Sequence, residues 1–285
     1  MRTIIAKQRA KYHKDLLSLG VLSLDTNGIP SNADRASKLS VQISKGIANR
    51  LSANTKTKAL GQTAGAQFEQ LNMEFLKCTF PLLQNIRPGS WHIMKLGNRN
   101  AIKASSFSQY EHLDYLAELT KQNAKLASIV GNDYMVSPDV VIYRDALEDS
   151  EINQEKTFVD DSVARMTDIR KKFNPSPILH ASISAKWTMR SDRAQNSRTE
   201  ALGLIRNRKG RLPHIVVVTG EPMPSRIASL AMGTGDIDCV YHFALYELIE
   251  AVKGTDDETS IELLNTLING KRLKDISDLP LDLAI

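Results

Sequence analysis

Cysteine is scarce in this chain: among its 285 residues only two are cysteine, Cys78 and Cys239. Neither belongs to a CxxC pair or to another spacing typical of zinc ligands, which argues against both a disulfide scaffold and a zinc site. The six histidines are likewise spread along the chain without a convincing metal-binding spacing. This composition fits a reducing compartment best, and we expect a cytoplasmic location.

Long hydrophobic runs are also absent. No apolar stretch approaches the roughly 20 residues that a membrane-spanning helix needs. Residues 1–14 are polar and basic, without the hydrophobic core of a secretory signal. A glycine-containing turn at 232–236 lacks the lysine of a phosphate-binding loop, so nucleotide binding is not expected. We therefore expect neither a membrane partner nor a nucleotide cofactor.

The sequence does have a modest excess of positive charge. Lysine and arginine number 37, against 32 aspartate and glutamate residues, which gives a net charge of +5. A basic balance suggests a polyanionic partner such as nucleic acid. Many basic proteins bind no DNA, however, so the net charge alone leaves the partner open.

The spacing of apolar residues divides the chain into a helical part and a mixed part. Helices are expected at 4–19, 32–53 and 59–84, with Ser31 or Asn32 as the cap of the second. Further on, strands are expected at 91–96, 140–143, 178–187, 214–219 and 237–241, and helices at 108–130, 194–205, 243–253 and 257–268, with a polar loop at 145–161. Strands that alternate with helices predict a single α/β domain over residues 1–285. In it, a mainly helical subregion at 1–90 precedes a core at 91–285, whose mixed central sheet is flanked by helices.

Three residues near the predicted strands form a candidate site. Asp139 stands directly before an apolar strand, where an acid is a poor strand former. Lys186 shares a face of the strand at 178–187 with Ser184, and Glu200 lies on the helix that follows. Each has an ordinary alternative: a turn acid, a solvated strand face and a solvated helix surface. Together they form a set of two carboxylates and a lysine.

Such a set suits the hydrolysis of phosphodiester bonds. Two carboxylates can hold a hard divalent cation such as Mg²⁺ through oxygen ligands, and the cation polarises a phosphoryl group. A lysine beside it can orient or deprotonate the attacking water and offset developing negative charge. Glu69, on the predicted third helix, is a further candidate, although an exposed helical acid is the simpler interpretation.

The pattern PD at 138–139, SAK at 184–186 and E at 200 resembles a variant of the PD-(D/E)XK nuclease motif. The usual second acid, two residues before the lysine, is Ser184 here, and its carboxylate is found at Glu200. This relocation is a feature of type II restriction endonucleases that recognise CCGG-containing DNA. Similarity to that family also runs through SNAD (31–34), GQT (61–63), IRPG (86–89), HASIS-x-KWT-x-RSDRAQN (180–196), RNRKGRLPHIVVVT (206–219), PSRI (224–227), IDCVYHFALYEL (237–248) and NGKRLKDISDLPLDLA (269–284).

The resemblance implies a restriction-endonuclease-like PD-(D/E)XK fold and a Mg²⁺-dependent enzyme that cuts double-stranded DNA. It implies that Asp139 and Glu200 are metal ligands, and that the backbone carbonyl of Ala185 could be a further one. Lys186 would then act on the attacking water. Ser184 and Glu69 would complete the catalytic surroundings.

A cluster suited to reading bases follows the strand of Lys186 directly, in Arg190-Ser-Asp192-Arg193. Arginine pairs with the O6 and N7 atoms of guanine, and aspartate accepts from the N4 amino group of cytosine. The alternative is that Ser191 or Asp192 only caps a helix. The resemblance implies that this cluster reads the inner CCGG in the major groove. It also implies outer readers of GC pairs, Asp34 and Arg226, and a minor-groove contact from Gln62.

The resemblance further implies the site GCCGGC, cut after the first G to leave four-base 5′ overhangs. It implies a homotetramer of two back-to-back dimers, each holding one duplex, and a separate methyltransferase in the same system. A basic cluster at Arg206, Arg208, Lys209 and Arg211 could contact phosphates or could form a solvated loop. Two other functions stay open: a DNA-binding protein that has lost catalysis, and a repair nuclease with structural rather than sequence preference.

Overall fold

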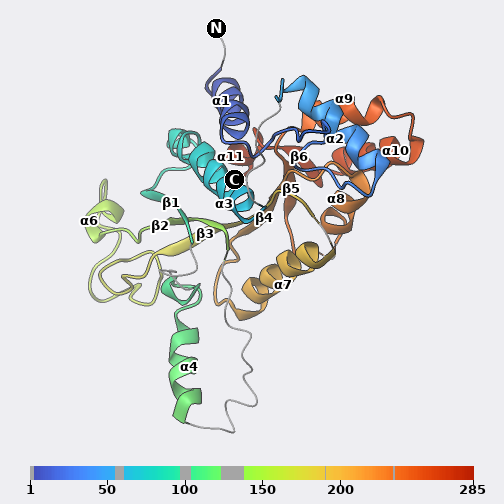
Figure 1. Ribbon diagram of the computed structural model, residues 1–285. Coiled ribbons are helices and arrows are strands. Elements are labelled where there is room, and N and C mark those ends of the chain that lie inside the picture. The colour runs from blue at the N-terminus through green and yellow to red at the C-terminus, as the bar shows by residue number, and fades with distance from the viewer. Residues whose placement is uncertain (1–2, 55–60, 97–103, 123–137, 190, 234) are drawn as a thin grey trace. The chain divides into compact units, whose positions relative to one another are not determined.

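The computed structural model describes residues 3–54, 61–96, 104–122, 138–189, 191–233 and 235–285 (Figure 1). The chain divides into two compact units. Residues 1–87, 183–199 and 215–285 form the first unit, and residues 88–182 and 200–214 form the second. The boundary runs through strand β3 (Ile178–Lys186) and helix α7 (Ser191–Asn207). The single domain expected over residues 1–285 stays a prediction.

The first unit contains most of the helices that the structure describes. Its elements are α1 (Ile4–Ser18), α2 (Lys38–Arg50), α3 (Gly61–Lys77), the 3₁₀ helix η1 (Phe80–Leu83), β4 (His214–Thr219), α8 (Pro224–Ala231), β5 (Cys239–His242), α9 (Leu245–Lys253), α10 (Glu258–Asn269), β6 (Leu273–Asp275) and α11 (Leu279–Asp282). The second unit contains β1 (Trp91–Lys95), η2 (Ala104–Ser106), α4 (His112–Gln122), β2 (Val140–Arg144) and α6 (Asp149–Ile152). No described helix is long and apolar enough to span a membrane.

The strands form one mixed sheet in the order β1-β2-β3-β4-β5-β6. Strand β1 runs antiparallel to β2, whereas β5 runs parallel to both β4 and β6. The predicted mixed sheet with flanking helices is therefore confirmed. Strand β4 has the predicted bounds, and all of it except His214 is buried, because a continuous apolar run fits a strand that is covered on both faces.

Helices α2 and α9 cross at very short range in the first unit. A Cβ built on Gly46 of α2 would lie only 2.7 Å from the Cβ of Ala251 in α9. Ile43 and Ile47 are fully buried on the same face of α2. Glycine and alanine at the crossing allow this approach, so the larger side chains on either side can pack into one core.

An ion network of two half-buried side chains and one buried acid connects helix α1 to the C-terminal part of the first unit. The guanidinium of Arg9 donates to Glu247 at 2.6 Å and to Asp275 at 2.8 Å. Asp275 is fully buried and also accepts the backbone N–H groups of Leu245 and Ser277. Every oxygen of this carboxylate therefore has a partner, which a buried charge requires.

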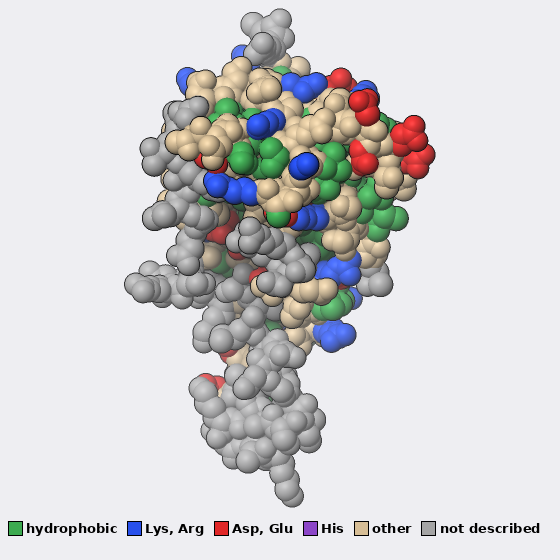
Figure 2. Space-filling view, turned by 45° about the vertical axis from the view of Figure 1, so that its right-hand side comes forward, with side chains coloured by type: hydrophobic (Ala, Val, Ile, Leu, Met, Phe, Trp, Pro, Cys, Tyr) green, Lys and Arg blue, Asp and Glu red, His purple; other side chains and the backbone are tan. Residues whose placement is uncertain are grey.

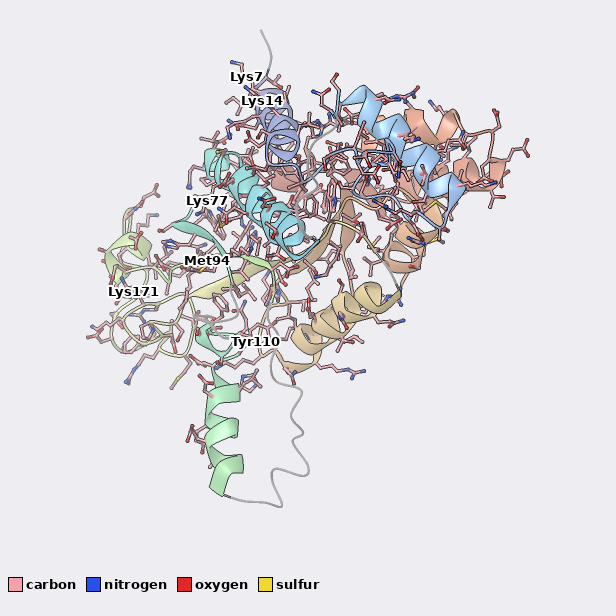
Figure 3. The ribbon with its side chains drawn as sticks, viewed as in Figure 1. Lys7, Lys14, Lys77, Met94, Tyr110 and Lys171 are labelled. Atoms are coloured by element: carbon pink, nitrogen blue, oxygen red, sulfur yellow. The ribbon has the colours of Figure 1, made fainter. Side chains whose placement is uncertain are left out.

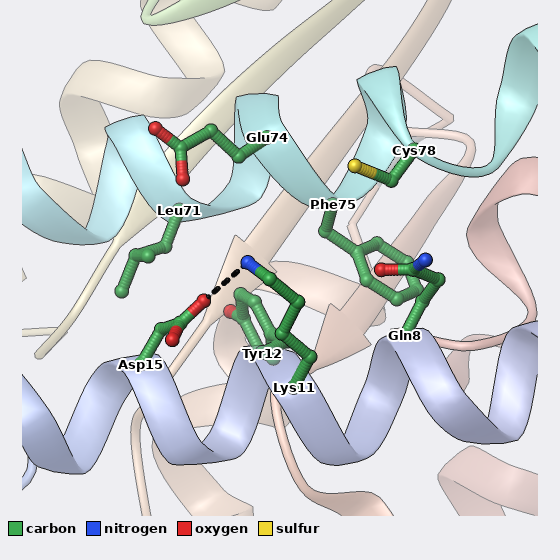
Figure 4. Close-up of a pocket in the computed structure, with 8 residues that line it drawn as sticks. All are labelled: Gln8, Lys11, Tyr12, Asp15, Leu71, Glu74, Phe75 and Cys78. Carbon is green, nitrogen blue, oxygen red and sulfur yellow. Dashed lines mark hydrogen bonds and ion pairs between the residues drawn. The ribbon is translucent and has the colours of Figure 1, made fainter.

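Helices α1 and α3 pack side by side, and a small pocket lies between them (Figure 4). The Tyr12 ring packs at a tilt on that of Phe75, with the centroids 5.5 Å apart, and its hydroxyl donates to the side chain of Asn72. On the rim, Lys11 pairs with Asp15 at 2.7 Å. The pocket volume of about 10 Å³ leaves room for roughly one water molecule, so it is no substrate site.

The second unit is held by two buried polar side chains. Tyr110, labelled in Figure 3, is buried, and its hydroxyl donates to the carbonyl of Leu204 in α7. Arg170 is fully buried and bonds to Asp149 and to the carbonyls of Asp160 and Val163. It thereby orders the polar segment that follows β2. The prediction that 145–161 is wholly loop is wrong at α6, where Glu148 and Glu151 form a capping box.

Two helix boundaries also differ from expectation. The prediction that Ser31 or Asn32 caps the second helix is wrong, because α2 begins at Lys38 and the Ser37 hydroxyl accepts from the N–H of Ser40. Ser31 and Asn32 are buried and bond to carbonyls elsewhere. The predicted helix at 59–84 ends at Lys77, and Thr79 and the 3₁₀ helix η1 follow. Of the predicted helix at 108–130, α4 is described, while 123–130 lie outside the described residues.

Candidate active site

The end of strand β3 carries the predicted lysine. Lys186 is half-buried, and its backbone carbonyl accepts from Thr219 Oγ1 at 2.9 Å and from the Gly220 N–H at 3.1 Å. A Cβ on Gly220 would lie 2.4 Å from the Trp187 ring, so only glycine lets β4 end this close to β3. The backbone of Lys186 is thus fixed by its neighbour in the sheet.

The polar row on β3 is not solvated, contrary to the simplest interpretation of its sequence. His180, Ser182 and Ser184 are at most 8% exposed. His180 packs between the rings of Trp91 and His214, at 4.7 and 5.1 Å, which is a structural role.

Ser184 occupies the position where the motif usually has its second acid. Its hydroxyl lies 3.3 Å from that of Ser197 in α7, and both side chains are buried. A neutral hydroxyl pair is tolerated at this depth, whereas a carboxylate would need a charged partner. The hydroxyl pair joins β3 to α7, the helix that carries Glu200.

The two predicted metal ligands both belong to the second unit. Asp139 directly precedes β2, and its carbonyl accepts the Leu96 N–H at 3.1 Å, which continues the pairing of β1 with β2. Glu200 lies in α7, and both residues are half-buried. Among the described residues, no group of three or more His, Cys, Asp and Glu side chains converges as a metal site. Two carboxylates and the Ala185 carbonyl are all-oxygen donors, which fit a hard divalent cation.

Glu69 lies on α3, and the packing of its neighbour locates this helix. Phe68 is fully buried, and its ring packs at a tilt on Trp187, the residue after β3, with the ring centroids 5.1 Å apart. Trp187 also packs at 5.1 Å on Phe243. Helix α3 is therefore held against the end of the strand that carries Lys186, with Glu69 half-buried on it.

The structure brings two of the predicted base-reading residues together. Arg226 of α8 and Asp34 are 192 positions apart in the sequence, yet the guanidinium donates directly to the carboxylate. Their side chains are 33% and 22% exposed, so both reach the surface. The hydrogen bond to Asp34 raises the pKa of Arg226. Asn32, which precedes Asp34 in the same loop, anchors that loop by donating to the carbonyl of Gly220 at 2.8 Å.

The remaining predicted readers are described only in part. Helix α7 begins at Ser191, so Asp192 and Arg193 lie in its first turn. Arg190 and the side chains of Asp192, Arg193 and Gln62 lie outside the described residues. Their roles, and the helix-capping alternative, stay predictions.

One residue of this region was missed by the sequence reasoning. Glu221 follows β4 in a Gly-Glu-Pro-Met-Pro segment that reads as a plain turn, yet its side chain is only 1% exposed. Its carboxylate accepts the Met189 N–H at 2.9 Å and the Met223 N–H at 3.2 Å. Burial raises the pKa of Glu221 to about 7, against the opposing effects of Met189, Arg226 and Met223. The signal in the sequence that could have indicated Glu221 is an acidic residue three positions before the PSRI block at 224–227.

The basic cluster at 206–211 is exposed, but part of its charge is already paired. Lys209 lies 2.7 Å from Glu111, and Arg208 donates to the carbonyl of Ile205. The face drawn in Figure 2 carries lysine and arginine side chains in several separate places, and its largest group of acidic side chains lies at the upper right edge. The phosphate-binding role of this cluster stays a prediction.

Comparisons with known proteins find relatives of this chain among restriction enzymes. The sequence model of the NgoMIV restriction enzyme family matches residues 12–285. The chain is 49% identical, over the full length of both chains, to the type II restriction enzyme NgoMIV of Neisseria gonorrhoeae. Among solved structures, it is similar to the type IIF restriction endonuclease Bse634I with cognate DNA (TM-score 0.36, 14% identity, 96% of this chain and 92% of that chain covered). It is also similar to a PspGI–substrate DNA complex (TM-score 0.30, 14% identity, 98% and 90% covered).

The match extends across both compact units and includes every block of residues that carried the resemblance. Site-specific endonuclease activity on DNA and a need for a divalent metal are general in this group. The chain belongs to the NgoMIV restriction enzyme family of type II restriction endonucleases.

Proposed function

We propose that this restriction endonuclease recognises GCCGGC in double-stranded DNA and cuts after the first G, leaving four-base 5′ overhangs. All the residue types that the family uses for reading and cutting are present in this chain. The observation that carries the proposal is the contact between Asp34 and Arg226, because two distant residues assigned to the same outer base pair lie together at the surface.

We assign the metal to Asp139 and Glu200, with the carbonyl of Ala185 as the third donor, and take Mg²⁺ as the cation. When bound, Mg²⁺ supplies Lewis-acid stabilisation of charge at the scissile phosphate. The oxygen-only donor set supports this choice over zinc, which favours nitrogen and sulfur ligands. Both carboxylates are half-buried, so they can be reached by a phosphate and still be held by their elements.

Lys186 orients the attacking water and offsets negative charge on the phosphate as the bond breaks. Its carbonyl has two donors from the neighbouring strand, so the strand end that presents the side chain is rigid. Ser184 holds β3 to α7 through Ser197 and replaces the acid of the usual motif without adding charge. Glu69 completes the surroundings from α3.

Arg190, Asp192 and Arg193 read the inner CCGG in the major groove, and Asp34 and Arg226 read the outer pairs. Aspartate accepts from the cytosine N4 amino group and arginine donates to guanine O6 and N7, so one Asp–Arg pair can contact both bases of a G·C pair. The pairing of Asp34 with Arg226 pre-orients both for that contact. Gln62 reaches the minor groove.

We further propose a homotetramer of two back-to-back dimers, each bound to one duplex, with a separate methyltransferase that protects the host site. A palindromic site requires two copies of the reading residues related by two-fold symmetry, which a dimer supplies. These assignments rest on the family resemblance and on the palindrome.

Cleavage of two plasmids tests the function directly. Purified protein and Mg²⁺ are incubated with a plasmid that contains GCCGGC and with a control plasmid that contains only other CCGG sites. We expect discrete cuts in the first plasmid alone, and end sequencing should map them after the first G. Cuts in both plasmids would reduce the claim to CCGG reading. Binding without cutting in either would favour the DNA-binding protein that has lost catalysis.

A further inference from the structure

The segment 186–189 joins the proposed catalytic lysine to the proposed reading cluster, and the end of β4 holds it at both ends. Thr219 and Gly220 bind the carbonyl of Lys186, at 2.9 and 3.1 Å. Glu221 binds the N–H of Met189 at 2.9 Å. Thr219, Gly220 and Glu221, three successive residues at and after the end of β4, therefore fix the position of the segment 186–189. This segment sets the distance between the proposed catalytic lysine and the proposed reading cluster.

The same carboxylate also reaches the outer readers. Its second oxygen accepts the Met223 N–H, at the start of α8, and lies 3.7 Å from the guanidinium of Arg226. Arg226 in turn bonds to Asp34. The backbone N–H of Glu221 donates to Thr219 Oγ1 at 3.1 Å, which fixes the acid itself.

We propose that Glu221 is a positioning residue. It fixes the segment that leads to the inner reading residues relative to the outer reading residues Asp34 and Arg226, so that discrimination between DNA sequences depends on it. This inference rests on the proposed function. Glu221 is buried and lies beside Arg226, so it acts through the segment before Arg190 and through Arg226, without touching DNA. Both side-chain oxygens of Glu221 accept backbone N–H groups. Glutamine cannot replace both contacts, because it offers one acceptor oxygen and turns an N–H toward a backbone N–H.

The test compares Glu221→Gln with the matched control Asp275→Asn. Asp275 is also a fully buried acid of the first unit that accepts two backbone N–H groups and pairs with an arginine, but its contacts are with Arg9, Leu245 and Ser277. Cleavage rates are measured on duplexes with GCCGGC and ACCGGT and on one with a single inner substitution. The melting temperature of each variant is measured alongside.

For Glu221→Gln we expect the preference for GCCGGC over ACCGGT to fall by about tenfold, since misplacing one Asp–Arg pair removes part of a base-reading contact. Asp275→Asn should lower the melting temperature and leave the preference at the wild-type value. A folded Glu221→Gln protein with wild-type preference overturns the inference while leaving the proposed site intact. A wild-type protein that does not prefer GCCGGC overturns the proposed site and this inference with it.

If Glu221→Gln does not fold, amide hydrogen exchange of the wild-type protein tests the inference instead. The Met189 N–H, which Glu221 accepts, should exchange far more slowly than in an unstructured peptide. Unprotected exchange at Met189 would overturn the inference.

Discussion

Lys186 is the residue whose removal should separate binding from chemistry. Its backbone is held by Thr219 and Gly220, so Lys186→Ala should keep the strand and the fold. The variant loses the group that orients water and offsets charge, and we expect hydrolysis to fall by about 10²–10⁴-fold. Single-turnover cleavage and a gel-shift titration, both with GCCGGC duplex, measure the two effects. Lys77→Ala, at the exposed end of α3, serves as the control. Cleavage at the wild-type rate would remove Lys186 from the mechanism.

Asp192 tests whether the cluster after β3 reads bases or only begins a helix. Asp192→Ala removes the carboxylate proposed to accept from cytosine, and we expect a loss of about 1–3 kcal/mol of discrimination at its base pair. Cleavage rates on the four duplexes that vary this pair give the discrimination. If Asp192 only caps α7, the variant should be less stable and its specificity unchanged.

Whether a polar residue is functional could be judged from the sequence only where its partners are local or where the family motif fixed its position. The motif predicts functional roles for Asp139, Lys186 and Glu200. Nothing in the sequence indicates the buried contact of Glu221, because its partner is the amide of Met189, 32 positions earlier. The sequence predicts Ser31 or Asn32 as a helix cap, but such side chains bond equally well to helix N–H groups and to distant carbonyls. Only tertiary structure distinguishes these cases.

Helices α2 and α9 cross so closely that only small side chains fit at the crossing point. Gly46→Ala adds a methyl group 2.7 Å from the Ala251 Cβ, so the helices must separate. Overpacking costs about 1–3 kcal/mol, and the better helix propensity of alanine offsets up to about 1 kcal/mol. We expect a net loss of stability, which urea unfolding can measure.

A matched glycine and a second-site change sharpen this test. A Cβ on Gly65 of α3 would meet nothing within 4 Å, so Gly65→Ala should stabilise the protein. Adding Ala251→Gly to Gly46→Ala should recover part of the loss, as expected of residues in direct contact. Equal effects of alanine at Gly46 and Gly65 would contradict the close crossing.

The sequence predicts some helices and strands better than others, depending on the length of the element and on how much of it is buried. The sequence predicts strand β4 with its bounds because four consecutive apolar residues, Ile215 to Val218, fit a strand that is buried on both faces. The helix α8, the three-residue strand β6 and the four-residue helix α11 were not predicted. Strand β6 and helix α11 contain less than two periods of any pattern, so neighbouring elements rather than their own sequence determine them, and α8 contains only about two helical turns.

At the scale of the whole molecule, two buried groups should give stability an unusual dependence on pH. Burial lowers the pKa of His242 to about 4. Between pH ~6.5 and about 4 the unfolded chain therefore binds a proton at this histidine and the folded chain does not. The free energy of unfolding decreases as the pH falls through this range. Glu221, which faces Arg226 and Asp34, has the opposite sign. Its pKa is raised to about 7, so stability is lost as the pH rises from ~4.5 through 7.

The two slopes overlap and partly cancel between about pH 4.5 and 6.5 in the wild-type protein. Glu221→Gln removes one of them. Its stability relative to wild type should therefore rise with pH by up to about 3 kcal/mol between pH 4.5 and 8, whatever offset the substitution introduces. Urea unfolding of both proteins at pH 5, 6, 7 and 8 measures this difference. A difference that stays constant across the range would mean that the effect of burial on the pKa of Glu221 is cancelled by its hydrogen bonds to Met189 and Met223 and by the charge of Arg226.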